Sequence, residues 1–239
     1  MSNPKFMLGY DYMLYARQNL KAAIYADEGH FHLSVVGGSG SGKSTALLYW
    51  LYKMRHLNVD LWVADFKKSG EFAGITPNFA EFEATYDLIC NAYEMFLSLP
   101  EGGDGRTHII LIDEVSGMLG HLGMTRDGKT RAENMRSILS TLLMLGRSRR
   151  TYVWLSMQRY SASIFPSASG AGDNFHICVG LGKLSTEGRK GLFAGEHFDG
   201  EEELLFGQGR GICLIDGQPL KGLIIPQVSK KKLLSLLQK

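Results

Sequence analysis

Residues 33–45 combine the residue types that bind the phosphates of a nucleotide. Gly37, Gly42, Lys43 and Ser44 complete the spacing G-x-x-x-x-G-K-[ST], between an apolar β-type run and a helix-compatible run. Backbone N–H groups must curl around the β-phosphate there, in conformations that glycine adopts most readily. We expect Lys43 to bridge the β- and γ-phosphates, Ser44 to ligate Mg²⁺ and Thr45 to contact the α-phosphate. The predicted nucleotide-binding residues are Gly37, Gly38, Ser39, Gly40, Ser41, Gly42, Lys43, Ser44 and Thr45.

An acidic pair follows another apolar run. Residues 108–112 are predicted to form a buried strand, and Asp113 and Glu114 come directly after it. In P-loop enzymes an acidic residue at such a strand end holds Mg²⁺ through water, and a Glu directly after it can polarise the attacking water. We therefore predict ATP and Mg²⁺ as cofactors, Ser44 and Asp113 as metal-site residues and Glu114 as the catalytic base. The pair favours hydrolysis, because a kinase gains nothing from activating water beside its γ-phosphate.

Two more predicted strands end in polar residues. Gln158 follows the strand predicted over 152–156 and is placed to hydrogen-bond the γ-phosphate or the attacking water. Asp65 and Lys67 follow the strand predicted over 59–64. Loops at the carboxyl ends of parallel strands form the ligand crevice, so both residues are expected near the site. A solvated turn is the alternative that remains open for them.

The positive charge of the chain is concentrated between residues 126 and 150. Arg126, Lys129 and Arg131 are predicted to form a basic loop with a turn at residues 127–128, followed by a buried helix over 138–145. A basic loop beside a nucleotide site suits contact with a phosphate backbone without sequence reading. We therefore predict that these three residues bind DNA, with an ordinary solvated loop as the alternative.

The remaining patterns predict an α/β fold with a mostly parallel central sheet flanked by helices. Further strands are expected over 31–36 and 176–180, and helices over 43–56, 79–99 and 186–189. A β-hairpin over 212–225 and a basic amphipathic helix over 229–238 are expected to close the chain. Residues 161–174 are expected to form a long polar loop, and residues 1–30 a strand or hairpin and a helix over 17–26. The predicted domains are this N-terminal extension, 1–30, and the motor domain, 31–239.

Composition limits the broad class of protein. The chain has 239 residues, 44% of them apolar, which suits one large α/β domain, and a net charge of only +2. Its three cysteines are too widely spaced for a disulfide framework or a zinc site, which fits a reducing cytoplasm. No apolar run approaches the ~20 residues of a membrane span. We expect a cytoplasmic protein that does not insert into membranes by itself.

Taken together, the motifs resemble the motor domain of the FtsK/HerA superfamily of DNA translocases, particularly the small FtsK-like proteins of mobile genetic elements. The likeness runs from about Phe31 to Leu214. The stretch 32–44 looks like the family's His-x-x-x-x-Gly-x-x-Gly-Ser-Gly-Lys-Ser. Residues 63–67 are similar to its Asp-Pro-Lys segment, 110–114 to its Walker B motif, and 156–159 to its Ala-Thr-Gln-Arg-Pro. The resemblance implies a RecA-like P-loop NTPase fold. It also implies a homo-hexameric ring that hydrolyses ATP and holds duplex DNA in its central channel.

The same resemblance brings two arginines into consideration. Gly146-Arg147 is similar to the Arg that precedes the family's fourth strand, and Arg189 falls where the family has Ser-Arg-Thr-Ile-Leu. Since Lys43 and Mg²⁺ already serve the phosphates of their own subunit, we expect Arg147 to act on a neighbouring subunit's ATP, with Arg189 as the reserve. A surface Arg at a helix end is the alternative for Arg147.

Departures from the family pattern limit what the resemblance implies. Phe66 and Tyr160 stand where the family has prolines, which affects the path of both loops. We expect no membrane-spanning region before the motor and no winged-helix module after it, so loading or anchoring falls to a partner protein.

Two other functions compete with a DNA translocase. One is a coupling or secretion ATPase that acts on a protein or nucleoprotein partner. The other, which Asp113-Glu114 disfavours, is a P-loop kinase with Arg147, Arg149 and Arg150 as a lid. DNA-stimulated ATPase activity separates the first from a DNA translocase, and product analysis separates the second.

Overall fold

A single ten-stranded sheet organises the computed structural model, which describes residues 5–27 and 29–238. The strand order is β2-β1-β10-β9-β8-β3-β7-β6-β4-β5. The strands are β1 (Lys5–Asp11), β2 (Ala23–Asp27), β3 (Leu33–Val36), β4 (Val59–Asp65), β5 (Asn78–Glu81), β6 (Thr107–Asp113), β7 (Thr151–Met157), β8 (Ile177–Leu181), β9 (Arg210–Ile215) and β10 (Lys221–Ile224). The six strands from β8 to β5 are parallel, and β9, β10, β1 and β2 extend the sheet in antiparallel fashion.

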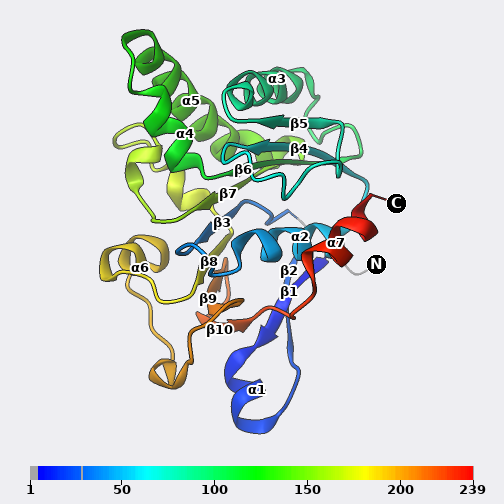
Figure 1. Ribbon diagram of the computed structural model, residues 1–239, viewed down its shortest axis with the longest axis vertical. Helices are drawn as coiled ribbons and strands as arrows, with labels where there is room; N and C mark the ends of the chain where they lie inside the picture. Colours follow the sequence, from blue (N-terminus) through cyan, green and yellow to red (C-terminus); the bar gives the residue numbers. More distant parts are fainter. Residues whose placement is uncertain (1–4, 28, 239) are drawn as a thin grey trace.

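Helices cover both faces of this sheet (Figure 1). They are α1 (Tyr12–Gln18), α2 (Lys43–Met54), α3 (Ala84–Ser98), α4 (Val115–Leu122), α5 (Arg126–Leu145), α6 (Thr186–Phe193) and α7 (Lys230–Leu237). Neighbouring strand residues point to opposite faces, so Val35 joins an apolar cluster with α2 and α7, and Val36 joins a second cluster with α3, α4, α5 and α6. The structure confirms the predicted fold class, including the C-terminal hairpin and helix.

The N-terminal extension differs from the sequence prediction. The helix expected over 17–26 is wrong, because α1 ends at Gln18 and residues 23–27 form β2. Asp11 explains the early start, since its Oδ1 accepts from Met13 N at 2.9 Å and Leu14 N at 3.1 Å and caps the helix. β1 pairs with β10, so the first strands belong to the motor's own sheet. Residues 1–4 of the expected extension, together with 28 and 239, lie outside the described residues.

The helix expected over 79–99 begins later than predicted. Phe79 lies in β5 opposite Val63 of β4, and α3 starts only at Ala84. Phe82 breaks the run between them with a left-handed φ of 48°. Phe79 and Phe82 matched the helical spacing of the later aromatic residues only by coincidence. Residues 78–81 form a strand instead of a helix, because they pair with β4 at the edge of the sheet.

The basic loop expected over 126–131 is also wrong, because these residues form the first turns of α5. Thr125 caps the helix, its Oγ1 accepting from Gly128 N at 3.0 Å. Gly128 is buried, and a Cβ on it would lie 1.9 Å from Leu122 O. The Asp-Gly pair therefore marks close packing between α4 and α5, not a turn. Residues 161–174 likewise contain short 3₁₀ turns and bury Ile164 and Phe165.

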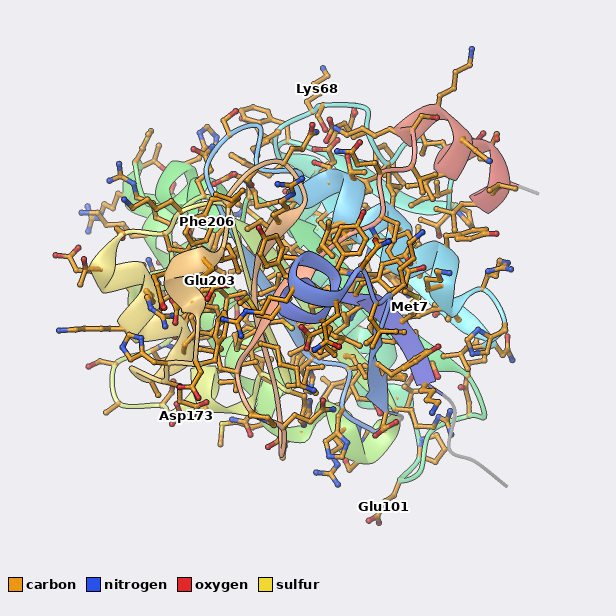
Figure 2. All side chains as sticks on the ribbon, turned by 90° about the horizontal axis from the view of Figure 1, so that it is seen from below. Met7, Lys68, Glu101, Asp173, Glu203 and Phe206 are labelled. Atoms are coloured by element: carbon orange, nitrogen blue, oxygen red, sulfur yellow. The ribbon has the colours of Figure 1, made fainter. Side chains whose placement is uncertain are left out.

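The two ends of the parallel strands define two opposite rims of the molecule. Figure 2 shows Lys68, which follows β4, on the rim opposite Glu101 and Asp173, which precede β6 and β8. The rim at the carboxyl ends of β3, β4, β6 and β7 carries the P-loop. Within residues 5–27 and 29–238, none of the helices is long and apolar enough to cross a membrane.

Candidate nucleotide site

The P-loop is a compact turn fixed from both sides. Gly37 N donates to Met157 O at 3.2 Å, and Gly209 N donates to Ser41 O at 2.9 Å. Gly40 and Gly42 adopt φ values of 77° and 99°, in the left-handed region that favours glycine. α2 begins directly after Gly42, which has no side chain that could cap the helix. The first amides of α2 and its positive dipole end therefore point into the loop, where they can bind an anion.

Lys43 lies folded back over this loop. Its Nζ donates to Gly37 O at 2.6 Å and to Gly38 O at 3.2 Å, and the residue is buried. Burial lowers the pKa of Lys43, and the neighbouring Lys67 lowers it further. Such a buried ammonium, held only by carbonyl oxygens, is suited to the charge-assisted bonds that phosphate oxygens offer.

Asp113 supplies the strongest sign of a metal site. It ends β6 with an exposed fraction of 1%, and neither carboxylate oxygen has a hydrogen-bond partner among the described residues. Burial raises the pKa of this carboxyl group above its usual value; the Ser156 hydroxyl and Lys67 lower it, and Asp65 and Glu114 raise it further. A bound divalent cation would favour the charged form of this buried carboxylate. Mg²⁺ prefers carboxylate, hydroxyl and water oxygens as ligands. The residues therefore fit Mg²⁺, with Ser44 and Asp113 as the groups that would hold it.

Glu114 follows Asp113 in a strained conformation and is held by an ion pair. Its φ is 63°, its backbone N donates to Ser156 O at 2.9 Å, and its Oε2 lies 2.8 Å from Lys67 Nζ. The loop that carries Lys67 is shaped by Asp65, whose Oδ2 accepts from Ser69 N, Ser69 Oγ and Gly70 N at 2.9–3.1 Å. Asp65 and Lys67 thus lie at the site, where the sequence placed them.

Glu71 also lies at the site, although no sequence pattern singled it out. Its carboxylate pairs with Lys230 at the start of α7. Burial raises the pKa of Glu71, but hydrogen bonds from Lys230 and Ser44 outweigh it and hold that pKa below its usual value. Glu71 therefore links the proposed Mg²⁺ ligand Ser44 to the C-terminal helix. It stands in an irregular polar loop, where neither spacing nor periodicity signals a role.

Two pockets flank the P-loop. One of about 400 Å³ begins at Gly42 and Thr45 and is walled by residues 208–209 and 225–230. The other, of about 410 Å³, is lined by Gly38 of the P-loop, by Gln158 and Arg159 after β7, and by residues 183–188. The structure thus brings Gln158 to the P-loop, at the same rim as Asp113.

Comparison with known proteins gives structural relatives and no sequence relatives. No family model matches the chain, and no curated protein sequence does. Solved structures resemble it over nearly all of its length. The conjugation coupling protein TcpA of pCW3, in its monomer form with ATPγS, has a TM-score of 0.73 at 16% identity, covering 98% of this chain and 71% of TcpA.

Two more solved structures have the same fold. The cytoplasmic domain of the type VII secretion ATPase EccC of Thermomonospora curvata has a TM-score of 0.69 at 17% identity, covering 98% of this chain and 30% of EccC. The genome packaging NTPase B204 of Sulfolobus turreted icosahedral virus 2, with AMPPCP, has a TM-score of 0.55 at 12% identity, covering 83% of this chain and all of B204. This chain therefore has the RecA-like α/β fold of these P-loop ATPase structures. It spans less than a third of EccC.

In this fold, Arg147 lies far from its own P-loop. Arg147 precedes β7, whereas Gln158 follows that strand. The seven residues of β7 span roughly 20 Å, so Arg147 and Gln158 lie at opposite ends of the strand. Ser148 O accepts from Gly102 N, which places this segment on the rim with Glu101 (Figure 2). Arg147 O accepts from Arg150 N at 3.2 Å, whereas the exposed side chain of Arg147 makes no hydrogen bond or ion pair with residues 5–27 or 29–238.

Arg189 is held within its own subunit. Its Nη2 lies 2.6 Å from Glu201 Oε2 and donates to Glu196 O at 2.7 Å. The guanidinium also packs over Phe193, 5.6 Å from the ring centre. Because these contacts occupy the side chain, Arg147 has the freer guanidinium of the two.

The three basic residues of α5 lie on the same rim as the P-loop. Arg126, Lys129 and Arg131 are exposed on its first two turns. Arg131 stacks over Tyr86, 4.8 Å from the ring centre, and lines a pocket of about 640 Å³ with Phe66 of the β4 loop. Their side chains therefore face outward from a helix beside the nucleotide rim.

Proposed function

We propose that this chain is an ATP-hydrolysing DNA translocase of the FtsK-like type that acts as a homo-hexameric ring. The observation that carries ATP hydrolysis is the buried, unpaired carboxylate of Asp113 next to Glu114, at the strand end facing Lys43 and Ser44. Such a carboxylate is costly to bury without a cation. A nucleotide-bound Mg²⁺ offsets that cost, and a neighbouring Glu gives the site a base for water.

Each residue of the site has a distinct task in this proposal. Lys43 turns from the carbonyl oxygens of Gly37 and Gly38 to the phosphates, and Ser44 and Asp113 hold Mg²⁺, which neutralises charge on the phosphates. Glu114 takes the proton of the attacking water, and Gln158 contacts the γ-phosphate or that water. The pocket beside Thr45 has room for the nucleoside, with the amide of Gln208 and the apolar wall of Pro226 as its neighbours.

DNA contact is assigned to the start of α5. Arg126, Lys129 and Arg131 offer three exposed cations along two helical turns, and Asp127 and Glu133 are the acidic residues among them. Because the net charge of the chain is only +2, such local clustering is what a phosphate backbone would recognise. This contact is expected to be independent of DNA sequence.

We infer the ring from Arg147 and its surroundings. Arg147 is too far along β7 to reach its own P-loop, and Met144 and Leu145 beside it are 54% and 55% exposed. Exposed apolar side chains beside an unpaired arginine are typical of a surface that a second subunit covers. In the proposed ring, Arg147 stabilises charge on the phosphoryl group of the neighbour's ATP.

A coupling or secretion ATPase is the second proposed function. TcpA is named as a conjugation coupling protein and EccC as a type VII secretion ATPase, and both match 98% of this chain. In that case the ring would act on a protein or nucleoprotein partner with the same ATP site.

ATP turnover with and without duplex DNA tests the proposal. We expect ADP and free phosphate as products, and a rate that rises several-fold with double-stranded DNA, more with long than with short duplexes. An ATP turnover rate that does not change with duplex DNA of any length would reject the translocase in favour of a protein-coupled ATPase. Phosphate transferred to a small acceptor instead of water would reject hydrolysis altogether.

A further inference from the structure

Three potential metal ligands meet on the rim opposite the P-loop. His30 precedes β3, His176 precedes β8, and Asp216 follows β9, which runs antiparallel to β8. One ligand atom from each of the three lies within 4.8 Å of the other two. The arrangement is fixed by the backbone, because His176 N donates to His32 O at 3.1 Å and Asp216 N donates to His176 O at 2.8 Å.

Histidine rings pack closely at this cluster. The His30 and His176 rings meet edge to face with centres 5.0 Å apart, and His32 stacks on His176 at 5.3 Å. A neutral imidazole has one ring nitrogen with a free lone pair, which is the form that ligates metals.

We propose that His30, His176 and Asp216 bind a divalent transition-metal ion of the Zn²⁺ class. Two imidazoles and one carboxylate are a donor set that Zn²⁺ accepts in tetrahedral geometry, with water or another group in the fourth position. Mg²⁺ fits less well, because it prefers oxygen ligands. The site is separate from the Mg²⁺ site at Ser44 and Asp113, since it lies at the other ends of the strands.

Two features of the surroundings affect binding. His176 Nδ1 accepts a long bond of 3.3 Å from His32 N, and a metal that takes either ring nitrogen must shift a proton or displace this weak bond. His30 is half-buried and Asp216 is exposed, so both can close on an ion without disturbing the core.

A bound ion would tie three separate chain segments together. It would join the loop before β3, the start of β8 and the β9–β10 turn, next to the rim where Arg147 is exposed. The ligands lie 40 to 186 residues apart in sequence, so they come together only in the folded chain, and an ion bound to them stabilises that state. Metal binding should therefore raise the melting temperature.

The direct test is binding of Zn²⁺ to the nucleotide-free chain, with Co²⁺ as a spectroscopic probe. We expect one tightly bound Zn²⁺ per chain by equilibrium dialysis, visible Co²⁺ bands of a tetrahedral N/O site, and a rise in melting temperature. His30→Ala and Asp216→Asn should each weaken Zn²⁺ binding by about tenfold or more, since even changes around metal ligands cost 10–100-fold. Both positions reach solvent, so both variants should fold.

Two control variants identify the site. His56→Ala removes an exposed histidine elsewhere, and Asp113→Asn removes the carboxylate of the nucleotide site; both should keep the wild-type Zn²⁺ affinity. Absence of a stoichiometric Zn²⁺ in the wild type would overturn the proposal. So would His30→Ala and Asp216→Asn variants that bind Zn²⁺ as tightly as His56→Ala.

Discussion

Lys67 Nζ lies 2.8 Å from Glu114 Oε2, so the proposed catalytic base is already held by a cation from the loop after β4. Burial alone would lower the pKa of Lys67, but Glu114 and Asp113 raise it above its usual value, which keeps the ammonium charged. The side chain of Glu114 is 11% exposed, and Lys67 is its ion-pair partner among the described residues. Lys67 is therefore a positioning residue for Glu114.

Lys67→Met should lower kcat by about tenfold or more while changing ATP affinity little, since positioned general bases contribute 10²–10⁴-fold. Lys68→Met is the matched control, because Lys68 is the next residue and its side chain points outward (Figure 2). Steady-state ATP turnover and binding of a fluorescent ATP analogue give the two readouts. Equal kcat in the two variants would show that Glu114 does not need Lys67.

Replacements of Lys43 and Glu114 should separate nucleotide binding from turnover. Lys43→Ala removes the phosphate clamp and should abolish ATP binding, whereas Glu114→Gln should bind ATP and stop hydrolysis. Binding by equilibrium dialysis and phosphate release by a colorimetric assay distinguish the two. Wild-type turnover by Glu114→Gln would mean that another group activates the water.

Part of this site could be predicted from sequence because its residues follow strand ends in known order. Lys43, Asp113 and Gln158 follow three strands that apolar runs made visible, and parallel strands bring their ends to one rim. Glu71 could not be found this way, because it lies in an irregular loop. His30, His176 and Asp216 share no spacing that marks a metal site, and only the sheet brings them together.

The errors in the fold prediction have local causes. The Asp127-Gly128 pair suggested a turn, yet Thr125 caps a helix there and Gly128 packs against Leu122. The aromatic spacing after Phe79 suggested one helix, yet residues 78–81 form a strand that pairs with β4. In both places tertiary contacts outweighed a local pattern.

Replacing Arg126, Lys129 and Arg131 together with Ala should weaken DNA binding equally for all sequences. The slope of log K against log salt should become shallower by about 0.9 for each phosphate that the variant no longer neutralises. Lys231→Ala with Lys232→Ala removes two exposed charges from α7 and serves as the control. An unchanged slope in the triple variant would remove these residues from the DNA interface.

Arg147→Ala should bind ATP normally and lose turnover by ~10³-fold, as arginines supplied in trans typically contribute. Mixing it with Lys43→Ala should restore some turnover, because a mixed ring pairs an intact P-loop in one subunit with an intact Arg147 in the next. Arg55→Ala, an exposed arginine after α2, should stay active. No recovery in mixed rings confirmed by native mass spectrometry would count against Arg147.

Buried histidines should make the fold sensitive to acid. The pKa of His32 is lowered to about 3, mainly by burial and to a smaller extent by His176. The pKa of His176 is lowered to about 4, mainly by burial and to a smaller extent by His30. Unfolded chains bind these protons near pH 6.5, so this stabilisation is complete above pH 6.5 and is lost as the pH falls toward 4 and 3.

The free energy of unfolding should therefore fall by up to ~1.4 kcal/mol per pH unit for His32 below pH 6, and by less for the more accessible His176. Urea titrations at several pH values measure this slope. His32→Asn should flatten it even if the variant is less stable overall, whereas His56→Ala should not change it. A slope that His32→Asn leaves intact would assign the acid sensitivity to other groups.

Movement along DNA, as opposed to DNA binding or ATP turnover, is the central claim. A duplex that carries a short third strand at one end reports it directly, because a motor advancing along the duplex displaces that strand. We predict ATP-dependent displacement by the wild type, with a delay that lengthens with the duplex, and none by Glu114→Gln. Displacement that is equally fast without ATP, or absent while DNA-stimulated turnover persists, would contradict translocation.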